Sequence, residues 1–433
     1  MGSPHSESEI NEILDNLFRN QSGKMVSRFT RLFGLNRLRM AEDVVQDAFT
    51  KAHGVWSDKG LPENPAGWLW QVARNRAIDL LRREKFLQSK EELLDNSESG
   101  MPNFISDEEL KDDQLRMIFT CCHPGIPEKS QIALTLKILC GFSISEIARA
   151  FLSKEATIAK RLTRARKKVS ELKIPYEVPA GKELANRLES VLKVLYLLFN
   201  EGYSPSSGDE PIRPDLCSEA IQLAKLLVEN PATESPQCHA LLALMLLNAS
   251  RFPARLDRDG NLLVLKEQDR SLWDREMISE GLFHLQKSVG SEVVTEYHLQ
   301  AAISACHSIA ESYESTDWKQ ILSLYNAYSK LNRSPIIALN RAIAVSKVHG
   351  PKAGIDEINK INDLKTLESY HLFYSALGDM NLQSGNNKEA LKNYQKALEL
   401  STVKAEQSFY QKRIKLCEQK LDLADRYSLA NSF

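Results

Sequence analysis

Residues 141–168 decide the fold of the middle of the chain, and they read GFSISEIARAFLSKEATIAKRLTRARKK. Ser143 and Glu146 have the Ser-x-x-Glu spacing of a capping box, which predicts a short helix beginning here. The apolar face of this helix consists of Ile147, Ala148 and Phe151. After a break at 152–153, a second helix is predicted, with Ile158 and Leu162 facing inward. Two short helices at this spacing, the second strongly basic, predict a helix-turn-helix.

The second helix of this pair is predicted to enter the major groove of duplex DNA. From residue 154 to residue 173, eight Lys and Arg side chains stand against two Glu side chains. The residues on its outer N-terminal side, where base edges are reached, are Thr157, Lys160 and Arg161. The residues expected to extend toward phosphates, which fix position but not sequence, are Arg164, Arg166, Lys167 and Lys168. The alternative is a solvated basic face on an ordinary helical hairpin.

A second candidate surface lies on residues 64–85, which read NPAGWLWQVARNRAIDLLRREK. Asn64 is the expected N-cap, with Pro65 at the first helical position. At helical spacing one face holds Leu69, Ala73, Ala77 and Leu80, and another holds Trp68, Gln71, Asn75, Asp79 and Arg82. An aromatic ring among amides and arginines suits a surface that stacks the bases of single-stranded DNA. The basic residues placed to meet phosphates are Arg74, Arg76, Arg82 and Arg83. The alternative, favoured for Trp70, is that Trp68 and Trp70 pack against a neighbouring helix.

The stretch 41–56, AEDVVQDAFTKAHGVW, predicts a helix with an acidic beginning. The polar residues crowded near its N-terminus are Glu42, Asp43, Gln46 and Asp47. Acidic side chains at that end interact favourably with the helix dipole, which is one sufficient explanation. The functional interpretation is a docking surface for a basic protein partner.

The composition is that of a globular protein. The 433 residues suggest about three domains, and 56 basic against 57 acidic residues give a net charge of −1. This balance disfavours binding of nucleic acid as a bulk polyelectrolyte, so any basic surface must be local. No apolar run approaches the roughly 18–20 residues that span a bilayer, and the N-terminal stretch lacks the features of a signal peptide. Seven cysteines without CxxC spacing favour a reduced, cytoplasmic protein.

Helical periodicity in nearly every segment predicts an all-α chain, with the first patterns near 7–20, 24–34, 41–57 and 65–86. We expect a first domain over 7–86, a flexible acidic linker over 87–106, a helix-turn-helix domain over 107–175 and a helical region over 182–433. Nine acidic residues and one lysine between positions 91 and 113 mark the linker. Residues 370–400 predict two antiparallel helices around a turn at 385–387, as in a tetratricopeptide-type hairpin.

Three polar motifs suggest other chemistry but lack its requirements. Cys121, Cys122 and His123 do not have the ligand spacing of a tetrahedral zinc site. The stretch 257–261, DRDGN, has Leu262 and Gln268 where a calcium loop needs Gly and a bidentate Glu, so a tight turn or small hairpin is favoured. The polar segment 200–215 carries Glu201, Tyr203, Asp209, Glu210 and Arg213, and such segments usually cap helices and form surface salt bridges. No nucleophile elbow, Walker loop or GxGxxG is found, so we expect no enzyme, metal or cofactor.

The stretches DVVQDAF, WLWQVARNRAIDLLRR and SEIARAFLSKEATIAKRLTRARKK belong to the three helical segments described first. They resemble, in this order, regions 2.2, 2.3–2.4 and 4.2 of extracytoplasmic-function (group IV) sigma-70 factors. Later motifs, among them FTCCHPGIP, LFNEGYSPSSGDE and SPIIALNRAIAV, are similar to the subgroup with a C-terminal tetratricopeptide-like extension. The resemblance covers residues 10–420. It implies two small helical domains that bind DNA and polymerase, followed by a helical extension. The implied function is that of an RNA polymerase sigma factor, which directs transcription initiation at promoters.

The resemblance also implies roles for particular residues. Those implied to meet the β′ clamp helices of core polymerase are Asp43, Gln46 and Asp47. Those implied to handle the −10 element as it melts are Trp68, Gln71, Arg74, Asn75, Asp79, Arg82 and Arg83. Those implied to read the −35 element are Glu155, Thr157, Lys160, Arg161, Arg164, Lys167 and Lys168. The polymerase β flap is a further expected contact, and the fused C-terminal region is expected to control activity with a ligand or protein partner. Leu152 departs from the family, whose turn usually has Gly there, so the angle of the second helix stays open.

Two other functions stay open at this point. A duplex-binding transcriptional regulator with a sensing helical domain accounts for the helix-turn-helix, but it leaves residues 64–85 and the acidic linker unexplained. An enzyme centred on the polar segment 200–215 is the third interpretation. Association with core RNA polymerase distinguishes a sigma factor from both.

Overall fold

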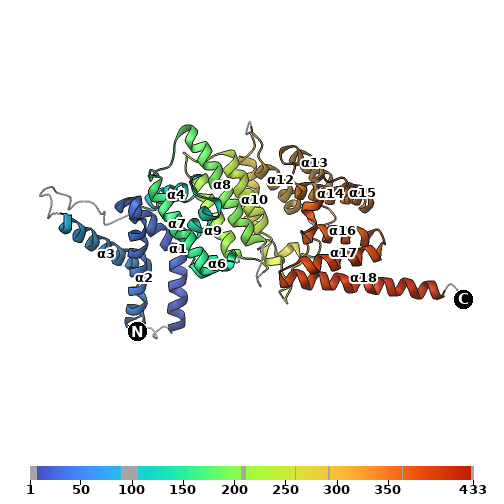
Figure 1. Cartoon of the computed structure of the whole chain (residues 1–433), viewed down its shortest axis with the longest axis horizontal. Helices are drawn as coiled ribbons and strands as arrows, with labels where there is room; N and C mark the ends of the chain where they lie inside the picture. The colour runs from blue at the N-terminus through green and yellow to red at the C-terminus, as the bar shows by residue number, and fades with distance from the viewer. Residues whose placement is uncertain are drawn as a thin grey trace. The chain divides into compact units, whose positions relative to one another are not determined.

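The computed structural model describes residues 7–88, 106–151, 153–205, 211–258, 260–290, 293–362 and 364–430. All the regular elements of these residues are helices, which confirms the predicted all-α class (Figure 1). The chain divides into two compact units, Met1–Leu197 and Leu198–Phe433. This division is coarser than the four segments expected from the sequence, whose boundaries stay predictions. None of the described helices is long and apolar enough to cross a membrane.

The first unit holds the candidate DNA-binding segments. Its elements are α1 (Glu7–Phe33), η1 (Leu35–Arg37), α2 (Leu38–Lys59), α3 (Pro65–Gln88), α4 (Asp107–Cys121), α5 (Glu128–Ile138), α6 (Ile144–Ala150), α7 (Glu155–Glu171) and the first part of α8 (Gly181–Tyr203). Helices α1, α2 and α3 pack on one another, with Val44, Ala48 and Trp56 of α2 and Leu69 and Ala73 of α3 buried between them. The apolar faces predicted for residues 41–57 and 65–86 therefore form one core.

Helix α1 is continuous where the sequence suggested two helices, 7–20 and 24–34, so that prediction is wrong. The reason is visible at Gly23. A Cβ atom there would lie 2.0 Å from the backbone oxygen of Leu139, just beyond the end of α5. Gly23 is thus placed for close approach of two backbones, not to end a helix.

Helices α4 to α7 form the second group of the first unit. The capping box is confirmed, because the Ser143 amide donates to the Glu146 carboxylate at 2.8 Å and the Glu146 amide donates to Ser143 Oγ at 3.1 Å. The inward face of α7 consists of Ile158, Leu162, Ala165 and Val169, all buried. The helix-turn-helix is therefore built from α6 and α7. Leu152, at the predicted break, lies outside the described residues.

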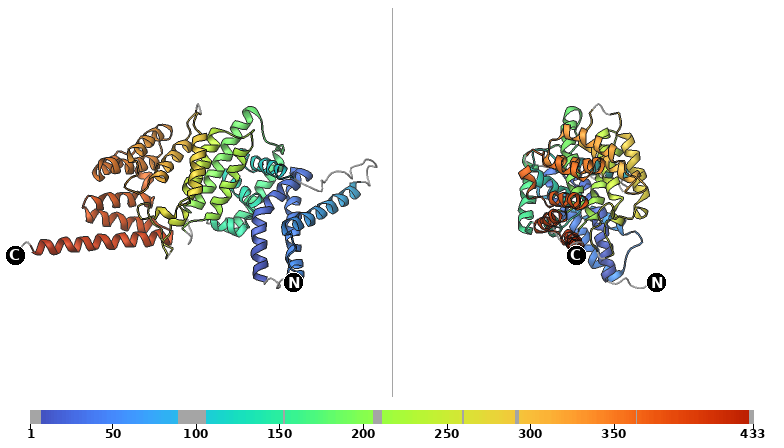
Figure 2. Two further views of the ribbon diagram at one scale, coloured as in Figure 1. Left: turned by 180° about the vertical axis from the view of Figure 1, so that it is seen from behind. Right: turned by 90° about the vertical axis from the view of Figure 1, so that its right-hand side faces the viewer.

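The second unit is a series of helices in which each α-helix from α9 to α18 packs on the next α-helix (Figures 1 and 2). Its helices are α9 (Pro214–Glu229), α10 (Pro236–Ala249), η2 (Phe252–Ala254), η3 (Arg270–Leu272), α11 (Arg275–Lys287), α12 (Glu296–Ile309), α13 (Trp318–Leu331), α14 (Pro335–His349), α15 (Pro351–Ile358), η4 (Leu364–Leu367), α16 (His371–Gln383), α17 (Asn387–Leu400) and α18 (Lys404–Ala430). The predicted helical hairpin over 370–400 is α16 and α17, joined by a turn in which Gly385 has φ of 78°. Its assignment to the tetratricopeptide type stays a prediction.

Candidate nucleic-acid interface

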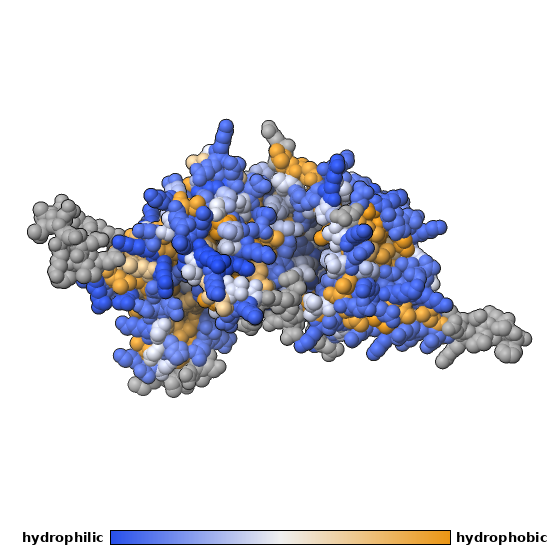
Figure 3. All heavy atoms as spheres, viewed as in Figure 1, coloured by the Kyte–Doolittle hydropathy of each residue, from blue (hydrophilic) through white to orange (hydrophobic). Residues whose placement is uncertain are grey.

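Helix α7 presents a basic face to solvent. The −35 candidates that are exposed are Glu155, Thr157, Lys160, Arg164 and Lys167, and those that are half-buried are Arg161 and Lys168. The ammonium group of Lys167 lies 3.7 Å from the Glu171 carboxylate, and both side chains are more than half exposed, so this pair leaves Lys167 accessible. Apart from Arg166, the residues predicted for base edges and for phosphates thus share one accessible surface, as the helical spacing indicated. Hydrophilic residues cover most of the face of the molecule shown in Figure 3.

Arg166 does not belong to that surface, which corrects the prediction that it extends toward phosphates. It donates from Nε to one Glu42 oxygen at 2.8 Å and from Nη2 to the other at 2.6 Å. Position 166 borders the buried Leu162–Ala165–Val169 stripe, so the orientation of α7 directs it toward α2. Glu42, predicted as part of an exposed acidic cluster, is accordingly drawn inward.

Helix α3 carries the second candidate surface. The Asn64 side chain accepts from the Gly67 amide at 2.8 Å, which confirms the predicted N-cap. The exposed −10 candidates are Gln71, Asn75, Asp79, Arg82 and Arg83, and Arg74 is half-buried. Gln71 donates to Asn75 at 3.2 Å, so the two amides order each other along the exposed face.

The two tryptophans of α3 differ in their surroundings. Trp70 lies against Phe29, with ring centroids 6.1 Å apart, and its Nε1 donates to Gln21 at 3.4 Å. This confirms the packing interpretation favoured for Trp70. Trp68 is half-buried and meets Trp56 edge to face, with centroids 5.5 Å apart. Packing therefore fixes part of the Trp68 ring, and the remainder reaches the surface.

The start of α2 carries the candidate protein-docking surface. Asp43, Gln46 and Asp47 are all exposed. Arg76 of α3 donates from Nε to Asp47 at 2.8 Å. Arg76, predicted to meet phosphates, thus pairs with a candidate polymerase contact in this arrangement.

The strongest polar cluster of the first unit was not predicted. Asp113 of α4 is fully buried, and its carboxylate accepts from Arg28 at 3.1 Å, Arg31 at 3.3 Å and Arg116 at 2.6 Å. The Tyr176 hydroxyl lies 2.8 Å from the Ser27 carbonyl oxygen and 3.0 Å from that of Asp113, and burial raises the pKa of this phenol. Asp113 had been counted with the acidic linker. Helical spacing could have indicated its burial, because Asp113 lies four residues before the buried Met117 and so on the same, inward face of the helix.

A further charged contact joins α1 to the helix-turn-helix. The Arg19 guanidinium donates to Glu146 and lies over the Phe142 ring, 4.7 Å from its centroid. Burial opposes ionisation of Glu146, but the hydrogen bonds from Ser143 and the charge of Arg19 outweigh it, so the pKa of this carboxyl is lowered. Together with the Asp113 cluster and the Glu42–Arg166 pair, this contact places ion pairs at three separate points between α1 or α2 and the α4–α7 group in the described part of the chain.

The alternative chemistries find no support among the described residues. Cys122 contacts the Thr135 hydroxyl at 3.7 Å and burial raises its pKa to about 12, while His123 Nδ1 accepts from the Gly125 amide at 3.0 Å. The Asp257 carboxylate binds Asn261, and Leu256 and Leu262 form an antiparallel bridge, as expected for the small hairpin. Asp259 of that turn, and Asp209 and Glu210 of the polar segment 200–215, lie outside the described residues. In that segment Arg213 pairs with Asp215, and the Tyr203 hydroxyl accepts from Arg251 at 2.6 Å.

Comparison with known proteins agrees with this geometry. Residues 18–86 match the family described as Sigma-70 region 2, and residues 116–169 match the family described as Sigma-70, region 4. Residues 187–289 match a family of unknown function (DUF6596). The chain is 40% identical over 377 residues to a protein of Rhizobium meliloti (strain 1021) named "Uncharacterized protein R00370", covering 86% of this chain and 88% of the relative. No solved structure matches the chain.

Proposed function

Because the chain belongs to the extracytoplasmic-function sigma-70 factors with a C-terminal extension, which direct RNA polymerase to promoters, we propose which surfaces carry this activity. Helix α3 contacts the −10 element and helix α7 reads the −35 element. Asp43, Gln46 and Asp47 of α2 contact the β′ clamp helices, and the α4–α7 group contacts the β flap. The main support is that two separate exposed faces lie within the two matched regions. The face with an aromatic ring and amides is on α3, in region 2, and the basic face is on α7, in region 4. Sigma factors of this kind are not enzymes.

The test is initiation by reconstituted polymerase. Core enzyme with the purified chain should start transcription at a specific promoter, and core enzyme alone should not. A test variant exchanges Asp43 and Gln46 for alanine, which removes two exposed side chains of the docking surface and leaves the core unchanged. This variant should bind core polymerase more weakly and retain its fold. Duplex binding by the chain without any association with polymerase would favour a transcriptional regulator instead.

Arg161→Ala and Lys167→Ala should have different effects on −35 recognition. If Arg161 holds a base edge, its loss should reduce discrimination between promoter variants by about 1–3 kcal/mol. Loss of Lys167 should weaken binding equally for all sequences and lower the salt dependence by about one ion. Fluorescence anisotropy at several salt concentrations measures both. Equal loss on all sequences in both variants would contradict the division of roles.

Trp68→Ala should impair promoter melting while sparing the closed complex. Stacking of an unpaired base on this ring is worth about 1–3 kcal/mol. Because the ring also contacts Trp56, Trp68→Phe is the matched variant, which retains an aromatic ring at that position. Permanganate footprinting should show reduced melting with alanine and partial recovery with phenylalanine. Equal melting in wild type and Trp68→Ala would rule out stacking.

We further propose that the C-terminal extension controls the activity, acting in cis where a separate anti-sigma factor acts elsewhere. Unit Leu198–Phe433 is longer than the first unit, and the matches to regions 2 and 4 both lie outside it. In the structure α1 and α2 are held to the α4–α7 group by Glu42–Arg166 and by the Asp113 cluster. A ligand or protein partner on the extension would act through its different affinity for held and released arrangements.

Truncation tests this control, and the structure indicates where to cut. Arg187 of α8 donates to the Phe119 carbonyl oxygen at 2.7 Å, and Lys193 pairs with Glu128 at 2.5 Å, so a cut after Pro179 would damage the first unit. A chain ending at Leu197 retains both contacts. It should fold and show altered transcription, either unregulated or abolished. Normal activity and normal regulation in cells would contradict control by the extension.

A further inference from the structure

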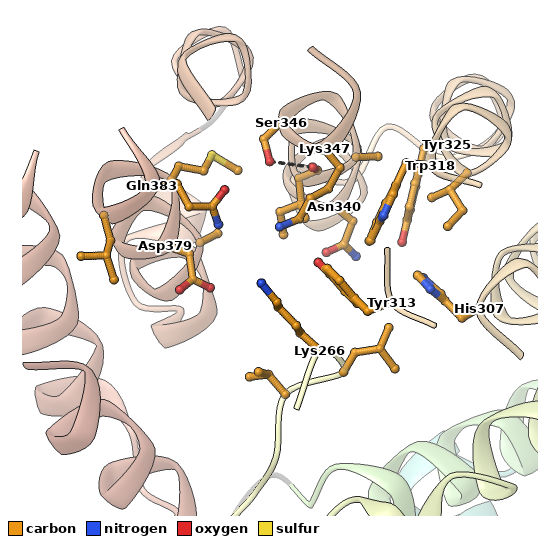
Figure 4. Close-up of a pocket in the computed structure, with 18 of the residues that line it drawn as sticks. Lys266, His307, Tyr313, Trp318, Tyr325, Asn340, Ser346, Lys347, Asp379 and Gln383 are labelled. Atoms are coloured by element: carbon orange, nitrogen blue, oxygen red, sulfur yellow. Dashed lines mark hydrogen bonds between the residues drawn. The ribbon is translucent and has the colours of Figure 1, made fainter. Parts of the chain in front are cut away.

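The second unit contains a cavity of about 450 Å³. It lies between the loop at 264–266, the α12–α13 loop that carries Tyr313, and helices α12, α13, α14, α16 and α18, so its walls come from segments spread over 150 residues of sequence (Figure 4). This volume falls within the roughly 300–1,000 Å³ typical of small-molecule sites. Apolar wall residues include Ile321, Ala344 and Met380. The size and lining favour a small organic ligand over a polypeptide.

One side of the cavity is aromatic. Tyr313, Trp318 and Tyr325 line it, and Trp318 meets Tyr313 edge to face with centroids 5.6 Å apart. Burial raises the pKa of the Tyr325 phenol to about 12, so this hydroxyl is a neutral hydrogen-bonding group. The adjacent His307 ring meets Trp318 at 5.3 Å between centroids, and its buried Nδ1 has no hydrogen-bond partner among the described residues. A planar group would find ring contacts and polar atoms on the same wall.

Two lysines give the cavity its charge. Lys347 of α14 is half-buried, with its ammonium 5.6 Å from the Tyr313 ring centroid and 6.0 Å from that of Trp318. Lys266 enters from the loop, and Figure 4 shows both side chains directed into the same space. Neither ammonium has a carboxylate within ion-pair distance in the described part of the chain. An ammonium group held against aromatic rings, with no acidic partner, is placed to bind an anion.

The other charged lining residues have partners of their own. Arg413 pairs with Glu267 at 3.1 Å, and the Asp379 carboxylate accepts a hydrogen bond from the Tyr394 hydroxyl. Lys266, Lys347 and Asp379 together leave one net positive charge facing the cavity. Asn340 adds an amide beside the lysines.

We propose that this cavity binds a small organic acid with an aromatic ring, the acidic group lying between Lys266 and Lys347 and the ring lying against Tyr313 and Trp318. The acid would be a carboxylate or a phosphate ester. This inference names the ligand class for the proposed control by the extension and rests on that control for its role. Binding of the ligand can be measured without polymerase or DNA. The proposed ligand site and the proposed control by the extension can therefore be disproved separately.

Isothermal titration calorimetry on the full chain tests the site with four probes: indole-3-acetate, phenyl phosphate, inorganic phosphate and the uncharged indole-3-acetamide. At least one ring-bearing acid should bind at or below millimolar concentration, and at least tenfold more tightly than inorganic phosphate and the amide. The preferred acid identifies carboxylate or phosphate ester. No binding of either acid at 10 mM, or binding of the amide as tight as that of the preferred acid, would overturn the proposal.

Lys347→Met and Lys266→Met retain the aliphatic stems and should each weaken binding of the preferred acid about tenfold or more. Lys319→Met is the matched control, because Lys319 is exposed on α13 and does not line the cavity. It should bind as the wild type does. Far-ultraviolet circular dichroism confirms that each variant is folded. Unchanged affinity in both cavity variants would overturn the site, whereas binding without any effect on transcription would contradict only the proposed control.

Discussion

Replacing Asp113 with alanine is expected to lower the stability of the first unit by about 3–5 kcal/mol, the cost of breaking a buried ion pair by removing one partner. The carboxylate is fully buried and the Arg28 side chain is only 6% exposed, so the variant leaves this guanidinium with only the more distant Glu109 carboxylate, at 3.8 Å. Arg116, 23% exposed, loses the same partner. Amide hydrogen exchange over α1 and α4 measures the opening free energy of this region directly.

The matched control is Arg31→Ala. Arg31 contacts the same carboxylate, but its side chain is 44% exposed, and exposed pairs contribute only about 0–1 kcal/mol. Asp113→Asn should fall between the two variants, because the amide keeps an acceptor oxygen and loses the charge. If Asp113→Ala cost no more than Arg31→Ala, the cluster would not hold α1 to α4.

Gly23→Ala should have the second largest effect, about 2–3 kcal/mol of destabilisation. The new Cβ would lie 2.0 Å from the Leu139 oxygen and 2.8 Å from its carbonyl carbon. Both obstacles are backbone atoms, so α1 and the end of α5 must move apart. If this docking opposes promoter engagement, the folded fraction of the variant should also transcribe more actively than the wild type.

Gly54→Ala provides the opposite control. Gly54 lies within α2, and nothing comes within 4 Å of a Cβ placed there. An alanine in an open helical position should stabilise the protein by about 0.5–1 kcal/mol. Thermal unfolding of both variants makes the comparison. Stabilisation by both alanines would show that α1 and α5 are not in close approach in solution.

Local signals in the sequence predicted the parts of the fold that depend on neighbouring residues. The capping box at Ser143 and Glu146, the Asn64 cap and the hairpin over 370–400 each involve groups within a few dozen residues, and all three are confirmed. The exposed faces of α3 and α7 followed from helical spacing alone. Their roles on DNA stay predictions.

Contacts between distant segments could not be predicted in the same way. Glu42 and Arg166 are 124 residues apart, and periodicity says nothing about which acid meets which base. The sequence predicted a break between residues 20 and 24, whereas Gly23 lies inside a continuous helix and permits close approach to the Leu139 backbone. Asp113 was grouped with its acidic neighbours since a charge run is usually solvated. The aromatic cavity of the second unit likewise assembles residues from five helices and two loops.

The continuity of α1 has a consequence for how the first unit responds to cleavage. With 27 residues, α1 is a rod of about 40 Å that contacts α2 and α3 as well as α4 and α5. The covalent connection between α3 and α4 is therefore not what keeps the two groups together. A protease site inserted between residues 88 and 106 should yield two fragments that copurify under native conditions and separate only in denaturant. The fragment with α1–α3 and the fragment that begins at α4 would then stay associated without a covalent connection, because α1 packs against both groups of helices.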